Sequence, residues 1–264
     1  MPEHYFTQTS DGFEPLPEAR GPWAADMLHG RLLGGLAAHV LERDHGRPQW
    51  RAARLTVDLF RPAGMEPVQV QTSLVREGRK VLVADAVMTC GGHTVGRTTA
   101  VFLPETQEPP GNIWRPQPSQ WPDPDTVPPP ADRQSGPDDE MGWLFRTVEG
   151  GFSTGQRSRV WTKDTVDLVE GVPMSPLVRA AVSGDIACPL SNSSDQGLYY
   201  INADYTMLIG RYPDGDWVGV EVDTQIAADG ISVASATLVD RLGPFATSGG
   251  TSIARPPLVH DEAQ

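Results

Sequence analysis

The chain has few of the features that mark secreted, membrane-spanning or metal-binding proteins. Its 264 residues include only two cysteines, Cys90 and Cys188, whose separation does not suit a metal site, so we expect free thiols in a reducing compartment. No apolar run approaches the ~18 residues that span a bilayer, and the first residues lack the basic and apolar segments of a secretion signal. The sequence therefore predicts a soluble, cytoplasmic protein.

Positive charge is also scarce. The chain has 21 Lys and Arg residues against 34 Asp and Glu residues, which gives a net charge of −13 and a pI near 4.8. Binding to nucleic acid or to an anionic membrane needs a basic surface, so neither is expected as a partner. An anionic ligand would need a local cluster of Arg or Lys. The chain has no HExxH or paired-cysteine motif, and we expect neither a metal nor another cofactor.

What the sequence does contain is an internal repeat. Residues 54–70 and 199–222 share one plan: β-prone residues, an arginine with a proline close behind, a short turn and then alternating valines. Arg61 and Arg211 are 150 positions apart, as are Thr56 and Thr206 (211 − 61 and 206 − 56). Such constant spacing predicts a duplicated unit of about 150 residues.

The hydrophobic pattern predicts one helix and an antiparallel meander in each half, which is an α+β fold. The first helix is expected over 27–43, where glycines at 30, 34 and 35 indicate close packing on a sheet. The second begins at Ser175-Pro176, with an N-cap and a first-turn proline, and is over by Pro189. Strands are expected at 5–13, 54–60, 68–75, 80–89 and 94–103, then at 141–152, 157–162, 198–211, 217–226, 231–239 and 245–254.

A segment rich in proline and acidic residues separates the two halves. It loses all periodicity, which is typical of an extended linker over the surface, and we expect Trp114 and Trp121 to attach it to the body. The predicted organisation is an N-terminal domain (1–103), a linker (104–139), a C-terminal domain (140–258) and a short tail (259–264).

One apparent catalytic motif does not fit its context. Residues 151–155 match the G-x-S-x-G pattern, but a nucleophile elbow needs a helix after the serine, and residues 157–162 look like a strand. We interpret this stretch as a hairpin turn.

A set of short motifs occurs in order along the chain: Gly21-Pro22-Trp23, His29-Gly30, the run 55–62 ending in Arg61-Pro62, Gly78-Arg79, Asp185, the run 201–206, Arg211, Asp216-Trp217-Val218-Gly219, Leu238-Val239-Asp240 and Gly243-Pro244. This ordered set resembles the double-hotdog acyl-CoA thioesterases of the thioesterase II-like superfamily. The resemblance covers nearly the whole chain except the linker, and it implies a tandem hotdog fold in which each half wraps an antiparallel sheet around a long helix. It also implies acyl-CoA as substrate and allows a homodimer or higher homo-oligomer.

The resemblance also implies catalytic residues. Asp185, after the second helix, takes the place of the catalytic aspartate, and Asn202 takes that of a polar partner on the next strand. The third position, on the last strand, is usually Gln, and the alignment places Thr251 there. A threonine is shorter and offers one hydroxyl in place of an amide, so the usual water-binding geometry is not assured.

Four further residues are candidates for binding substrate: His29 and Gly30 at the start of the first helix, and Arg61 and Arg211 for the phosphates of coenzyme A. Helix-start N–H groups attract carbonyl or phosphate oxygens. Each residue also has a purely structural interpretation, because His29 could pack against Trp23 and each arginine precedes a turn and could be solvated.

Structural roles are equally open for the catalytic candidates: Asp185 could close the helix, Asn202 could satisfy backbone groups at a strand end, and Thr251 could belong to a flexible strand tip. The leading hypothesis is hydrolysis of acyl-CoA thioesters by an Asp-activated water. Alternatives are a relative that binds acyl-CoA without cleaving it, a hotdog hydratase, and an assembly module built from sheet edges.

Overall fold

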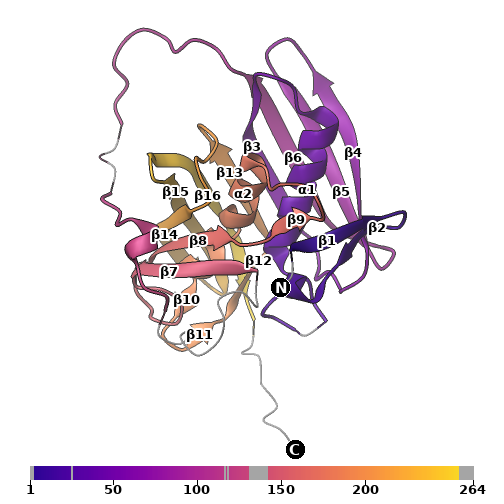
Figure 1. Ribbon diagram of the computed structural model, residues 1–264. Coiled ribbons are helices and arrows are strands. Elements are labelled where there is room, and N and C mark those ends of the chain that lie inside the picture. Colours follow the sequence, from indigo (N-terminus) through magenta and orange to yellow (C-terminus); the bar gives the residue numbers. More distant parts are fainter. Residues whose placement is uncertain (1–2, 25, 116, 118, 131–141, 256–264) are drawn as a thin grey trace, which may run out of the picture.

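The computed structural model describes residues 3–24, 26–115, 117, 119–130 and 142–255 (Figure 1). In these ranges fourteen strands form one sheet, in the order β7-β8-β14-β15-β16-β13-β3-β6-β5-β4-β2-β1-β9, with β12 paired to β16. Neighbours are antiparallel except at the edge, where β9 runs parallel to β1. None of the helices described is long and apolar enough to cross a membrane.

The first half of the chain forms one arm of this sheet, and α1 (Gly30–His45) packs against it (Figure 1). Strand β5 shows why, because every second residue from Leu82 to Cys90 is buried while the residues between face outward. The strands of this arm are β1 (His4–Thr9), β2 (Gly12–Pro15), β3 (Trp50–Leu59), β4 (Val68–Glu77), β5 (Leu82–Cys90) and β6 (His93–Pro104).

The second half forms the other arm, with two shorter helices, α2 (Pro176–Gly184) and α3 (Ala187–Ser191). The strands of this arm are β7 (Trp143–Glu149), β8 (Arg159–Asp164), β12 (Tyr200–Asn202), β13 (Asp204–Ile209), β14 (Val218–Ala228), β15 (Ile231–Asp240) and β16 (Gly243–Ala254), with a separate pair, β10 (Ser193–Ser194) and β11 (Gly197–Leu198). One strand of the second half, β9 (Asp167–Val169), crosses to the first arm and pairs with β1 at its edge. The chain reverses direction between β7 and β8, so the interpretation of residues 151–155 as a turn is confirmed.

The two arms meet where β13 pairs with β3. Thr206 lies opposite Thr56 in the antiparallel register, and their hydroxyl oxygens are 3.1 Å apart. These are the residues whose separation of 150 positions indicated the repeat. From this seam the strand order is the same in both directions, 3-6-5-4 on one side and 13-16-15-14 on the other.

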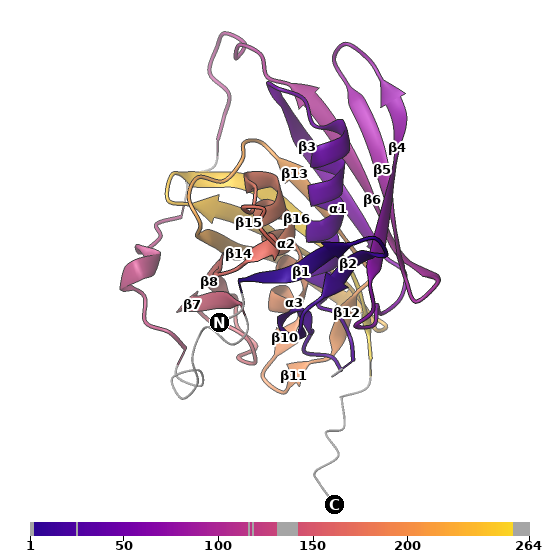
Figure 2. The ribbon, with the colours of Figure 1, turned by 45° about the vertical axis from the view of Figure 1, so that its right-hand side comes forward.

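Helices α1 and α2 lie side by side on the concave face (Figure 2), and two glycines of α1 allow their approach. A Cβ atom at Gly35 would lie 2.6 Å from Val182 Cγ1 on α2, and one at Gly34 would overlap the hydroxyl of Tyr205. That hydroxyl is buried and donates to the carbonyl of Ala181, 3.0 Å away. Gly34 therefore allows the close packing on the sheet that was predicted, since Tyr205 lies on β13, whereas the packing of Gly35 against α2 was not predicted.

Two expectations about the elements were wrong, and one helix was not expected. The second helix does not match the long helix of the first half, because α2 has 9 residues and α1 has 16. It ends at Gly184, before Pro189 as predicted, but an unexpected short helix, α3, follows and contains Pro189. The single strand expected over 198–211 is divided, because Ala203 separates β12 from β13.

The linker contacts the outer side of the second arm through Trp121. Its ring lies 4.7 Å from that of Trp161, whose indole N–H donates to the carbonyl of Pro122 at 3.1 Å. Trp114, by contrast, is 83% exposed, so only one of the two tryptophans attaches the segment as expected. A short 3₁₀ turn, η2 (Pro124–Thr126), follows.

Replacing Gly34 by alanine tests the helix packing. The new methyl group must displace the buried Tyr205 ring or break its bond to Ala181, and we expect Gly34→Ala to lower the free energy of unfolding by about 1–3 kcal/mol. Urea denaturation measures this. Gly30→Ala is the control, because its Cβ would make only ordinary contact with Leu59 at 3.6 Å. Equal stabilities for the two variants would contradict the packing account.

Candidate active site

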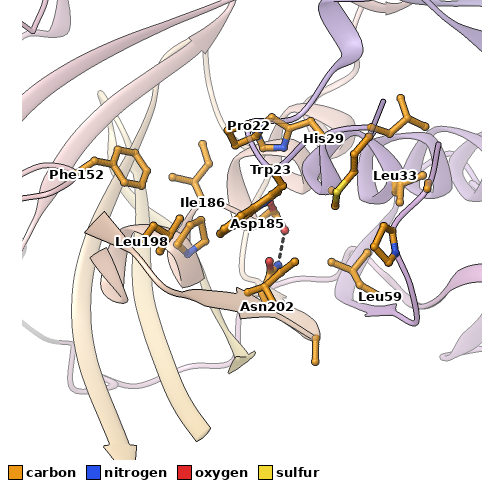
Figure 3. A pocket seen from close by; sticks show the side chains of 18 of the residues that line it. Pro22, Trp23, His29, Leu33, Leu59, Phe152, Asp185, Ile186, Leu198 and Asn202 are labelled. Atoms are coloured by element: carbon orange, nitrogen blue, oxygen red, sulfur yellow. Dashed lines mark hydrogen bonds between the residues drawn. The ribbon is translucent and has the colours of Figure 1, made fainter. Parts of the chain in front are cut away.

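A pocket of about 840 Å³ opens where the start of α1, the end of β3, β7 and β12 converge (Figure 3). Its wall is mostly apolar and rich in aromatic rings. Asp185, Asn202, His29, Thr147 and Arg61 are its polar and charged side chains. A mostly apolar cavity with a few convergent polar groups suits a ligand that has an apolar chain and one reactive polar centre. The aromatic lining comprises Trp23, Phe60, Trp143, Phe145 and Phe152.

Asp185 and Asn202 meet inside this pocket (Figure 3). Asp185 is the C-cap residue directly after α2, and Asn202 is the last residue of β12. The amide nitrogen of Asn202 donates to Asp185 Oδ1 at 2.7 Å. The structure thus brings together two residues that are 17 positions apart in the chain. The family resemblance had assigned both of them to the catalytic site.

The carboxyl group of Asp185 is buried, with 4% of the residue exposed. Burial raises its pKa to about 6, while the hydrogen bond from Asn202 and the positive charge of Arg31 act in the opposite direction. A carboxylate with a pKa in this range can take a proton from water near neutral pH and return it to a leaving group.

His29 and Gly30 form the start of α1 and also line the pocket. His29 is the N-cap, and its Nδ1 accepts a long hydrogen bond of 3.5 Å from the backbone N–H of Arg31. Burial, together with the charge of Arg31, lowers the pKa of His29 to about 3, so the ring is neutral and carries its proton on Nε2. The backbone N–H of Gly30 has no acceptor among the residues described. Both groups can donate to an oxygen atom in the pocket.

Thr251 does not join this group. Its hydroxyl and its backbone N–H both donate to Asp204, the side chain is exposed, and the residue does not line the pocket. Its neighbour Ser252 is the direct cross-strand partner of Asn202 and is buried on the same face of the sheet. Successive residues of a strand face opposite sides of the sheet, so Thr251 faces outward and Ser252 faces inward. The position assigned to Thr251 was therefore one residue away from the inward-facing one. The inward positions nearby are Ser248, Gly250 and Ser252, and none carries an amide side chain.

Of the two arginines predicted to bind phosphate, only Arg61 lies at the pocket. Arg61, just after β3, lines the pocket and is exposed. Arg211 does not line it, because its guanidinium group binds both carboxylate oxygens of Asp240 and the carbonyl of Gly243. Because its guanidinium group is held in this bidentate ion pair, Arg211 has a structural role.

The sequence analysis missed a buried charge cluster behind the pocket wall. Arg31 is 1% exposed; its Nη1 donates to Asp164 Oδ1 at 2.7 Å and its Nη2 to the Tyr5 hydroxyl at 2.7 Å. The guanidinium carbon lies 4.6 Å from the ring centroid of Trp143, which packs edge-on against His29. The sequence signal for this cluster was an arginine within the otherwise apolar stripe of the first helix. Its partner could not be identified from the sequence, because Asp164 is 133 positions away.

Breaking the Arg31–Asp164 pair tests whether the cluster supports the fold. Arg31→Met leaves the Asp164 carboxylate buried without its partner, and we expect the free energy of unfolding to fall by about 3–5 kcal/mol. Adding Asp164→Leu removes the stranded charge and should recover part of the loss. The control is Arg97→Met, which breaks an ion pair with Asp85 at the surface and should cost less than about 1 kcal/mol. Equal losses in urea denaturation for Arg31→Met and Arg97→Met would contradict this account.

The raised pKa of Asp185 predicts a pH-dependent stability. The folded state disfavours the charged carboxylate, so this group costs nothing below the unfolded-state pKa near 4, and its penalty grows to about 3 kcal/mol as pH rises through 6. We expect Asp185→Asn to be more stable than the wild type at pH 8 by up to about 3 kcal/mol and equal to it at pH 4. Urea unfolding at both pH values measures the difference. The matched control, Asp223→Asn on the exposed side of β14, should differ by less than about 0.5 kcal/mol at either pH.

Comparison with known proteins gives a consistent family. Residues 19–103 match the profile of the acyl-CoA thioesterase N-terminal domain, and residues 115–251 match that of the acyl-CoA thioesterase C-terminal domain. No curated protein is similar enough to this chain to count as a match.

Solved structures show the same fold at low sequence identity. A putative thioesterase II from Thermobifida fusca YX is 18% identical, with a TM-score of 0.70 and coverage of 91% of each chain. A conserved protein with a hotdog fold from Alicyclobacillus acidocaldarius is 18% identical, with a TM-score of 0.69 and coverage of 93% of each chain. The acyl-CoA thioesterase II TesB2 from Mycobacterium marinum is 15% identical, with a TM-score of 0.64, over 86% of this chain and 91% of that one.

Proposed function

The chain belongs to the acyl-CoA thioesterase family and is a thioester hydrolase, and from this premise we propose that it cleaves acyl-CoA thioesters with a water molecule activated by Asp185. The observation that carries the proposal is the buried carboxylate of Asp185, held by Asn202 at 2.7 Å inside an apolar pocket. The products are a free carboxylic acid and coenzyme A.

In the first step the Asp185 carboxylate takes a proton from water, and the hydroxide attacks the carbonyl carbon of the thioester. Asn202 keeps the carboxylate oriented, because its amide occupies Oδ1 and leaves Oδ2 for the water. A carboxyl group whose pKa lies near 6 accepts this proton more readily than an exposed aspartate would.

The attack moves negative charge onto the carbonyl oxygen. The free N–H of Gly30 at the positive end of α1 and the Nε2–H of neutral His29 are the donors that would stabilise it. When the tetrahedral intermediate collapses, the C–S bond breaks and the coenzyme A thiolate takes the proton held by Asp185. The carboxylate is then ready for another water molecule.

We also propose that the two arms are fused hotdog domains, residues 1–103 and 140–258, connected by the linker 104–139. The mirrored strand orders 3-6-5-4 and 13-16-15-14 support this organisation, as does the position of Thr56 opposite Thr206 at the seam. In this arrangement the start of α1 from the first domain faces the end of α2 from the second, and each domain supplies part of the site.

Substitution of Asp185 tests the mechanism. Asp185→Asn keeps the hydrogen bond from Asn202 but cannot take a proton, and we expect kcat to fall at least about 100-fold with the fold intact. The measurement is release of free thiol from a panel of acyl-CoA substrates. For the wild type, kcat/KM should fall about tenfold per pH unit below pH 6, because the carboxylate must be ionised to act.

Thr251→Val is the matched control. It removes the hydroxyl bonded to Asp204 outside the pocket and should leave kcat within about twofold. A folded Asp185→Asn variant with wild-type turnover would refute the assignment, and so would a strong loss confined to Thr251→Val.

A further inference from the structure

The free cations at the pocket mouth point to the part of the substrate that lies outside the acyl pocket. The chain carries a net charge of −13, and many of its arginines, including Arg31, Arg179 and Arg211, are held in ion pairs. Arg61 and Arg255 form no ion pair with any residue that the structure describes. Unpaired cations on an acidic protein suit an anionic ligand, because the remaining surface repels one.

The strand register places these two arginines at the same end of the sheet. Strands β3 and β16 both run antiparallel to β13, so they point the same way. The N–H of Leu59 donates to the carbonyl of Ala203 at 2.8 Å, and the N–H of Ala203 donates to the carbonyl of Thr251 at 2.9 Å, which puts all three residues level.

Arg61 follows Leu59 by two residues and Arg255 follows Thr251 by four, so both continue past that level in the same direction. Two strand spacings, roughly 10 Å, separate the strands that carry them. Arg61 and Ile253, two residues before Arg255, both line the pocket.

An aromatic ring lies beside this pair. The guanidinium carbon of Arg255 is 5.2 Å from the ring centroid of Trp23, and Trp23 also lines the pocket. A cation held over an indole ring keeps its outward N–H donors free for a second partner. Trp23 therefore positions Arg255 at the rim of the pocket that holds Asp185.

We propose that Arg61 and Arg255, with Trp23 as the platform for Arg255, bind the phosphate groups of the coenzyme A nucleotide while the acyl chain occupies the apolar pocket. This assignment rests on the proposed function, because it takes the substrate to be a coenzyme A thioester. Guanidinium groups bind phosphate through paired N–H donors, and the coenzyme A nucleotide carries a diphosphate and a separate phosphate that two such side chains can bind.

The test compares two substrates with the same acyl group, the acyl-CoA and the acyl-N-acetylcysteamine thioester, which lacks the nucleotide. For Arg61→Gln and Arg255→Gln we expect KM for the acyl-CoA to rise about tenfold each, with kcat unchanged. The rise should shrink at high salt. Hydrolysis of the truncated thioester should be unaffected. Arg54→Gln is the matched control, since Arg54 is an exposed arginine on β3 that does not line the pocket.

Calorimetric titration with coenzyme A alone separates this inference from the proposed function. If the wild type hydrolyses neither thioester, the proposed function fails, and weaker coenzyme A binding by the two variants would still support the phosphate site. An unchanged KM and an unchanged affinity for coenzyme A in both variants would overturn the site. Equal losses on the two substrates would overturn it as well, because they would indicate damage to the catalytic centre.

Discussion

The pairing of β13 with β3 is the constraint on which the rest of the structure depends. It joins the two arms into one sheet and sets Leu59, at the end of β3, beside Ala203. Asn202 is thereby held next to the loop that follows β3, and α1 and α2 lie side by side on the same face. A shift of this register would displace the start of α1 and the end of β3, which the first arm supplies to the pocket, relative to Asp185 and Asn202, which the second arm supplies.

The side-by-side helices create two places where one helix starts beside the end of the other, and the two places carry different side chains. At one, the end of α2 places Asp185 in the pocket that the start of α1 lines. At the other, Glu42 near the end of α1 accepts a hydrogen bond of 2.5 Å from Ser175, the N-cap of α2. The carboxylate of Glu42 is thus bound by the cap of the neighbouring helix. The two helix junctions therefore differ, because only the one at the end of α2 places a carboxylate in the pocket.

Much of the architecture was predictable because it follows from local patterns. Alternating apolar residues and turn glycines predicted the strands of both arms, and Thr56 and Thr206, whose spacing indicated a repeat, lie opposite each other at the seam. The wrong predictions have physical causes. The second helix ends before Pro189 as predicted, but the short helix α3 around Pro189 was missed, because a proline in the first turn of a helix loses no hydrogen bond.

The candidate site was predictable only in part. Asp185 and Asn202 came from a resemblance, and their contact is a tertiary fact that no local pattern contains. Thr251 was one residue from the inward face, and a single sequence does not fix strand register at that accuracy. The Arg31–Asp164 cluster depends on partners far apart in the chain, as does the stacking of Arg255 on Trp23.

The central claim is that the Asp185 carboxylate activates water and does not itself attack the thioester. A single turnover in ¹⁸O-labelled water, with enzyme in excess over acyl-CoA, tests it most directly by mass spectrometry of the acid and of the peptide that contains Asp185. The account predicts one ¹⁸O atom in the released acid and none in Asp185. An unlabelled acid together with ¹⁸O in the Asp185 carboxylate would contradict it.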